Sequence, residues 1–198
     1  MLVESLGSGI LVGKLRGGKI KNLIHIHIKG WPLMIASAWI EIAAGYLLQK
    51  EIEPAAAWVT QNLWFIHLLT YGLLFWSLYL NRQERGFKWI FLGILLNFMV
   101  IMANGGQMPV DIREIDRELY KTTIERLENG KDMVHRVMDE ETRLKLLGDI
   151  LPLRKPYPFP KSLSMGDIVM IGGIALFTQE KMKEKIGTST SQESKYSI

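Results

Sequence analysis

Two aspartates in this sequence have the types and spacing of an acid–base pair. Asp149 and Asp167 each stand in a Gly-Asp-Ile triplet, eighteen positions apart. Two carboxyl groups within hydrogen-bonding distance do not readily ionise together, so they share a proton and serve as general acid and base. Asp149 follows the end of a predicted helix, where the protonated form is favoured, and Asp167 lies in a predicted first turn, where ionisation is favoured. The pair predicts hydrolysis by an activated water, with Asp167 as base and Asp149 as acid.

The segment between the two aspartates is rich in proline. Prolines at 152, 156, 158 and 160 cannot continue a helix, so this segment is an extended or looped connector. The connector can fold back and bring the carboxyls together, although its length does not require this. Each aspartate also has a structural alternative. Asp167 can be the N3 residue of a helix capped by Ser164, and Asp149 can bond to the turn before Pro152.

Six further residues are predicted to line the same polar site. They are Asn104, Gly105, Gly106, Glu41, His67 and Asn97. Asn104 and the two glycines would supply N–H donors to a developing oxyanion, and they can equally form a helix stop. Glu41 needs a partner on another helix, because an ionised carboxylate in lipid costs ~2.5–3.5 kcal/mol. The candidates are Asn97, His67 and Ser5. No metal site and no cofactor are predicted.

The composition of the chain points to a membrane. Hydrophobic residues make up 48% and charged residues 22% of the sequence, and the two kinds form separate blocks. The lack of cysteine excludes disulfides, thiolate metal sites and cysteine nucleophiles. The net charge of +4 comes from short clusters beside apolar runs, not from a basic surface interleaved with aromatic residues. We therefore expect the lipid bilayer as a partner and no nucleic acid.

Five apolar segments are predicted to cross the membrane as helices, at residues 1–13, 31–48, 62–80, 87–103 and 165–177. Lysine and arginine gather in the loops 14–30 and 81–88 and after the fifth segment, whereas the loop 49–61 has a single lysine. The positive-inside rule then predicts a multi-pass protein of a bacterial cytoplasmic membrane. Its N-terminus would lie outside and its C-terminus in the cytoplasm.

The predicted fold is an all-α membrane protein of about five transmembrane helices with a two-helix extracytoplasmic cap. Spans one to four occupy 1–103, the cap and the connector 104–164, the fifth helix with its basic end 165–186, and a disordered cytoplasmic tail 187–198.

The two cap helices are predicted from local signals. Asp111 and Glu114 form a capping box before a helical repeat that stops at Asn129-Gly130. A second amphipathic helix is expected from Met133 to Leu147, with His135 on the surface of the cap.

Four segments carry a resemblance to known proteins. They are RGGKIKNL at 16–23, NGGQMPV at 104–110, LGDILPL at 147–153 and SMGDI at 164–168, and they resemble a family of small uncharacterised bacterial membrane proteins. The resemblance covers most of the chain and implies no particular activity.

Residues 148–177 are also similar to the end of lipoprotein signal peptidases, which are aspartic peptidases that work at the outer interface of the membrane. The shared order is aspartate, proline-containing connector, aspartate and apolar helix. The Asn and Arg that flank the first aspartate of that family are absent around Asp149, and Met165-Gly166 replaces its Asn-x-Ala before the second. This likeness implies a peptidase with Asp149 and Asp167 as its catalytic residues.

Three classes of function follow from these observations. The first is an aspartate-dyad peptidase that cleaves a membrane-associated peptide. The second is a non-catalytic membrane protein that binds a partner protein through its cap. The third is a transporter or metal-binding protein that uses Glu4, Glu41 and His67. Such a protein needs a continuous polar route to the cytoplasm. We expect no polar residue in the inner halves of the third and fourth spans that could build this route.

Overall fold

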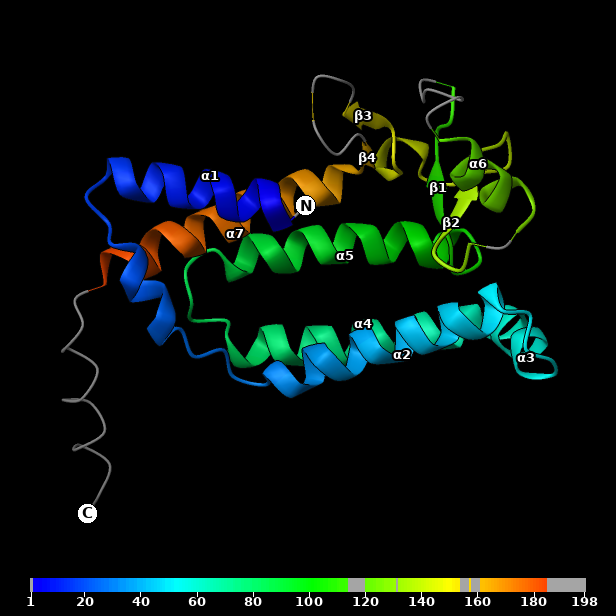
Figure 1. Ribbon diagram of the computed structural model, residues 1–198, viewed down its shortest axis with the longest axis horizontal. Coiled ribbons are helices and arrows are strands. Elements are labelled where there is room, and N and C mark those ends of the chain that lie inside the picture. Colours follow the sequence, from blue (N-terminus) through cyan, green and yellow to red (C-terminus); the bar gives the residue numbers. More distant parts are fainter. Residues whose placement is uncertain (1, 114–119, 131, 154–156, 158–160, 185–198) are drawn as a thin grey trace, which may run out of the picture.

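A computed structural model shows a mostly helical chain with a small cap at one end (Figure 1). The structure describes residues 2–113, 120–130, 132–153, 157 and 161–184. The predicted tail, 187–198, and Glu114 of the predicted capping box lie outside the described residues.

Five long helices begin within one residue of the predicted apolar segments. They are α1 (Leu2–Leu15), α2 (Trp31–Gln49), α4 (Leu63–Leu80), α5 (Phe87–Ala103) and α7 (Met165–Lys183). Gly30 and Gly86 precede α2 and α5 with φ of 71° and 91°, a conformation that glycine adopts without steric cost. The turn after α2 and the end of α5 lie at the cap end of the bundle, and the loops before α2 and α5 lie at the other (Figure 1).

Helix α7 packs along both α1 and α5, and glycines make this packing close. A Cβ added at Gly93 of α5 would lie 2.4 Å from the backbone oxygen of Gly166 in α7. One added at Gly9 of α1 would lie 3.0 Å from the Cα of Ala175. Small residues at these positions let the helix backbones approach each other, as in many helix pairs within membranes.

Helix α2 pairs with α4, and the short helix α3 (Ala55–Gln61) lies in the turn between them. Aromatic rings join this pair to α5. Tyr71 and Phe75 of α4 contact Phe98 with ring centroids 5.2 and 5.6 Å apart, and Phe75 also contacts Phe91 at 5.2 Å. At the cap end, a buried apolar cluster joins α2, α3, α4 and the cap through Ala44, Leu48, Val59, Leu63, Ile66 and Met133.

Two of the described helices, α2 and α4, are long and apolar enough to cross a membrane; α5 is apolar but has 17 residues. The core helix of a soluble protein can share these properties, but it is mostly buried. Here only 11% of the 18-residue apolar stretch in α2 and 33% of the corresponding stretch in α4 are buried inside the protein. The exposed side chains of the two helices include Trp31, Ile35, Trp39, Ile42, Tyr46, Trp64, Phe65, Leu69 and Trp76. Exposed apolar surface on this scale indicates membrane association.

The described part of the cap contains one α-helix and four short strands. The helix is α6 (Lys121–Glu128). Strand β1 (Met108–Val110) pairs in parallel with β2 (His135–Val137), and β3 (Leu151–Leu153) pairs antiparallel with β4 (Lys161–Leu163). The described residues also form two 3-10 helices, η1 (Ile20–His25) before α2 and η2 (Lys145–Leu147) before Asp149.

The prediction of a two-helix cap is therefore wrong for residues 133–147. Their apolar side chains serve two different cores, because Met133 joins the bundle cluster and Val137 packs against the cap cluster around Val110. Their backbone groups bond to β1 rather than within a helix: Met108 N donates to the Val134 oxygen and Met138 N donates to the Val110 oxygen. A helix-like spacing over a few residues does not reveal such long-range partners.

The expectation that the inner half of the third span lacks polar residues is also wrong. Ser77 of α4 is buried near the end opposite the cap, as is Asn81, the residue that follows the helix. Ser77 Oγ and Asn81 Nδ2 both donate to the backbone oxygen of Lys29, at 3.3 and 2.6 Å. These bonds fix the loop before α2 and give the two residues a structural role.

Candidate functional site

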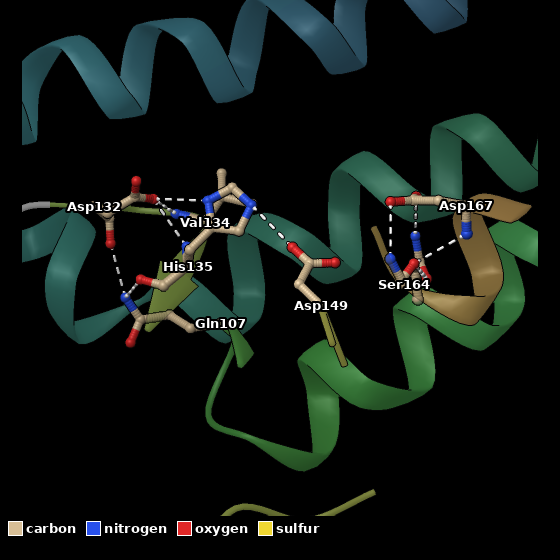
Figure 2. Close-up of polar contacts among 8 residues, drawn as sticks. Gln107, Asp132, Val134, His135, Asp149, Ser164 and Asp167 are labelled. Atoms are coloured by element: carbon tan, nitrogen blue, oxygen red, sulfur yellow. Dashed lines mark hydrogen bonds and ion pairs between the residues drawn. The ribbon is translucent and has the colours of Figure 1, made fainter. Parts of the chain in front are cut away.

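A histidine and two aspartates form a chain of polar contacts inside the cap, which we name the acid–histidine cluster: Asp132, His135 and Asp149. Nδ1 of His135 lies 3.2 Å from Oδ1 of Asp132, and Nε2 lies 3.7 Å from Oδ2 of Asp149. Figure 2 shows the ring between the two carboxylates, with one nitrogen toward each. Such a ring can exchange a proton with either side.

Local bonds fix the orientation of His135. Oδ1 of Asp132 accepts from the backbone N–H groups of Val134 and His135, at 2.9 and 2.8 Å. Nε2 of Gln107 donates to the backbone oxygens of Asp132 and His135, at 2.8 and 3.3 Å (Figure 2). The turn from Asp132 to His135 is thus held from both sides before strand β2 begins.

The backbone of Asp149 is bound to the loop around β1. Its N–H donates to the Pro109 oxygen at 2.9 Å, and its own oxygen accepts from Asp111 N at 3.0 Å. A Cβ at Gly148 would lie 2.8 Å from the Pro109 oxygen, so only glycine permits this close approach. The glycine of the first Gly-Asp-Ile triplet therefore has a backbone role, and it places Asp149 in a position where only 8% of the residue is exposed.

Burial and charge set the protonation of the cluster. Burial raises the pKa of Asp149 to about 7; His135 opposes this rise and the charge of Asp167 adds to it. Burial would raise the pKa of Asp132 as well, but its bonds with His135 hold it at about 2. Burial would lower the pKa of His135, but the hydrogen bond and charge of Asp132 outweigh it and the pKa is raised. Asp149 therefore changes its protonation near neutral pH, while Asp132 stays ionised.

The second predicted aspartate, Asp167, caps α7. Its N–H donates to Ser164 Oγ at 2.9 Å, and its Oδ2 accepts from Ser164 N at 3.2 Å, which completes a capping box. Its Oδ1 accepts from Asn97 Nδ2 of α5 at 3.0 Å. Both carboxylate oxygens are therefore used, and they hold the start of α7 against α5.

Asp149 and Asp167 lie near each other without a direct bond. Figure 2 shows them on neighbouring segments, each turned to its own partners, and among the described residues no hydrogen bond joins their carboxyls. The charge of Asp167 still acts on Asp149 and adds to the rise of its pKa. The geometry makes His135 the direct acid–base neighbour of Asp149.

The predicted oxyanion donors are largely engaged elsewhere. The amide of Asn104 donates to the backbone oxygens of Val100 and Arg143, and its oxygen accepts from Arg143 N at 2.9 Å. Gly106 N donates to the Ile101 oxygen at 2.9 Å. Gly105 and Gly106 have φ of 73° and 92°, so the segment Asn104-Gly105-Gly106 ends α5 and positions the cap.

Glu41 and His67 form a separate polar contact between α2 and α4. Oε1 of Glu41 accepts from Thr70 Oγ1 at 2.9 Å and lies 3.5 Å from His67 Nδ1, one of its expected partners. His67 is buried, and within the described residues neither of its ring nitrogens has a hydrogen-bond partner of good geometry. The predicted site residues therefore form three local groups at the cap end, around Glu41, Asp167 and Asn104, beside the acid–histidine cluster.

Two members of the cluster were not predicted as site residues. His135 was expected on the surface of the cap, but only 39% of its side chain is exposed and its ring faces Asp149. The only local signal is an aspartate three residues before a histidine, which also occurs on ordinary helix surfaces. Among the described residues, no group of three or more histidine and carboxylate side chains is arranged to hold a metal ion.

Comparison with known proteins places the chain in a family. It is 29% identical over 177 residues to an uncharacterized protein of Thermotoga maritima, and the match covers 89% of each chain. No solved structure matches it. The model of the family of unknown function DUF5317 matches residues 25–179, so the chain belongs to that family.

Proposed function

We propose that this protein is a multi-pass membrane protein that hydrolyses a membrane-associated peptide at the acid–histidine cluster, on the outer side of a bacterial cytoplasmic membrane. In this proposal Asp149 is the proton donor. His135, which Asp132 orients, takes the role of second acid–base group that the sequence suggested for Asp167. Asp167 positions α7, and its negative charge helps to raise the pKa of Asp149. The peptide substrate follows from the similarity of residues 148–177 to lipoprotein signal peptidases.

The placement of Asp149 carries the proposal. A carboxyl group is costly to bury, and folding alone favours exposing it or pairing it closely with a cation. Asp149 is instead buried 3.7 Å from a histidine nitrogen, with a pKa of about 7. General acid–base catalysis is most efficient when the pKa lies near the working pH. The partly exposed ring of His135 links this buried carboxyl to the surface of the cap.

The five-span topology is supported by the helix order and by the charges at the two ends. Lys and Arg gather at the end opposite the cap, in the loops 16–30 and 81–86 and at the end of α7. At the cap end, the loop 49–61 has a single lysine, and residues 104–164 have eleven basic and eleven acidic side chains. We place the cap outside and the basic end in the cytoplasm.

Cysteine labelling tests this topology, because the natural chain has no cysteine. Glu140→Cys in the cap and Gln83→Cys in the loop before α5 each introduce one exposed thiol. In intact spheroplasts, a membrane-impermeant maleimide is expected to label position 140 and not position 83. Both are expected to react after permeabilisation. Labelling of position 83 alone in intact spheroplasts would reverse the orientation.

The hydrolase proposal is tested by comparing membrane proteomes of cells that carry variants. Cells with Asp149→Asn or His135→Gln are expected to accumulate the same uncleaved membrane peptides as cells that lack the protein, because the proton donor or its partner is lost. Glu140→Gln, which removes an exposed carboxylate of the cap, is the matched control and is expected to behave as the natural protein. The proposal fails if Asp149→Asn leaves the peptide pattern unchanged while the protein is inserted at normal levels.

A second function, non-catalytic binding of a partner protein through the cap, is favoured by one observation. Leu144 and Leu146, which precede Asp149 in the sequence, are 44% and 78% exposed although they are large apolar side chains. Exposed apolar residues on a cap can mark a protein contact. Under this alternative, Leu146→Ser reproduces the effect of deleting the protein and Asp149→Asn does not, whereas the hydrolase proposal expects the reverse.

A further inference from the structure

An open pocket of about 380 Å³ lies at the end of the bundle opposite the cap. Its lining includes three cationic side chains: Arg16 after α1, Arg85 before α5 and Lys183 at the end of α7. The remaining polar lining comes from Gln179, Glu180 and Glu184 of α7 and the residue after it. Segments far apart in the sequence thus bring positive charges around one hollow.

The charges of the pocket do not cancel. Glu180 lies 3.6 Å from Arg85, whereas Lys181 lies 2.8 Å from both Glu184 and Glu84 and is shared between these two acids. Arg16 donates to the neutral side chain of Gln179 at 3.2 Å. No ion pair joins Arg16 or Lys183 to a carboxylate within the described part of the chain. Among the described residues, four cations thus face three carboxylates around the pocket, which leaves one net positive charge, and Arg16 and Lys183 are the two cations that no ion pair engages.

The surroundings of the pocket indicate the depth at which that anion lies. Trp31, Trp76 and Trp89 are more than half exposed near the same end of α2, α4 and α5, as expected for side chains at the headgroup level of a bilayer. Leu176 of α7 lines the pocket itself, and Leu15, next to Arg16, is 80% exposed. The pocket thus has cations at the headgroup level and apolar side chains beside it.

We infer that this pocket binds the phosphodiester headgroup of an anionic phospholipid, with Arg16 and Lys183 as the main contacts and the acyl chains along Leu176 and Leu15. The inference rests on the proposed membrane topology. Basic pockets between helices on the cytoplasmic side suit anionic lipid headgroups, which are the anions present at this depth. Lys183 lies in the last turn of α7, where its positive charge also complements the helix dipole. Because this structural role alone could account for the lysine, the experiment measures lipid binding directly.

Native mass spectrometry of the full-length protein in detergent tests the inference. The protein is titrated with phosphatidylglycerol and, separately, with phosphatidylcholine. We expect preferential retention of phosphatidylglycerol, and we expect Arg16→Gln with Lys183→Gln to lower its affinity by about tenfold or more. The matched control is Lys19→Gln with Lys21→Gln, which removes the same charge from exposed residues at the same end that do not line the pocket. The control is expected to change the affinity by less than about threefold.

Three outcomes overturn the inference. Equal retention of both lipids shows that the charge of the headgroup is not recognised. An equal loss of affinity in the two double variants shows diffuse attraction and no pocket. Release of phosphatidylglycerol by millimolar inorganic phosphate assigns the pocket to a soluble phosphate group. Alkaline carbonate extraction of cell membranes is run in parallel, because release of the protein there contradicts the membrane topology itself and not the pocket.

Discussion

Replacing Asp149 by Asn is expected to stabilise the protein above neutral pH. The pKa of Asp149 is raised from an ordinary value of 3.8 to about 7. This difference corresponds to a cost of at most about 4 kcal/mol for keeping the ionised carboxylate in the folded protein. Asn has nearly the same shape and no charge, so it removes the cost.

The sign of the pH dependence follows from proton binding. Between about pH 4 and pH 7, the folded protein holds a proton on Asp149 that the unfolded chain has released. Stability from this group is therefore fully present below pH 4, falls as the pH rises, and stays low above pH 7. Asp149→Asn is expected to flatten this part of the profile, with the largest gain at about pH 8 and a smaller gain at about pH 5.

The measurement is the midpoint of thermal unfolding in detergent, followed by tryptophan fluorescence at several pH values. Asp167→Asn is the contrasting variant. A single amide oxygen cannot accept from both Asn97 and Ser164 as the carboxylate does, so a loss of about 1–2 kcal/mol is expected at pH 5, where Asp149 holds its proton. A lower midpoint for Asp149→Asn at pH 8 would show that Asp149 is an ionised structural residue. A residue whose loss stabilises the fold is one kept for function.

Gly93→Ala is expected to destabilise the protein by about 1–3 kcal/mol or more, because it overpacks the contact between α5 and α7. The new Cβ would lie 2.4 Å from the Gly166 oxygen and 2.5 Å from Met170 Cγ. The backbone oxygen belongs to the first turn of α7 and cannot move alone, so the two helices must separate. Asn97 lies one turn from Gly93 and bonds to Asp167 at 3.0 Å, so this bond is lost as well.

Gly72→Ala is the matched control for this experiment. A Cβ at Gly72 of α4 would meet nothing within 4 Å. Alanine is also a better helix former than glycine by about 1 kcal/mol, so no loss of stability is expected. Both variants are compared by the midpoint of thermal unfolding. Equal midpoints would contradict the close packing of α5 on α7.

The positions of the long helices could be read from the sequence because their signals are local. An apolar run, a flanking glycine and the Ser164–Asp167 cap each depend on residues within a few positions. The starts of α2 and α5 after Gly30 and Gly86 follow from such signals. The need of Glu41 for a partner also follows locally, because a carboxylate in an apolar helix is costly wherever that helix packs.

The contact of His135 with Asp149 depended on tertiary structure alone. Asp132 and His135 reach Asp149 because β2 pairs with β1 and the backbone of Asp149 bonds to the loop on either side of β1. Instead of the helix expected at 133–147, the chain forms strand β2, a loop and the 3-10 helix η2. No local sequence pattern between residues 132 and 149 predicts that side chains from the two ends of this segment meet. The bond of Asn104 to Arg143 and the close approach of Gly148 to Pro109 position the cap, and this packing decides that the histidine and not Asp167 is the neighbour of Asp149.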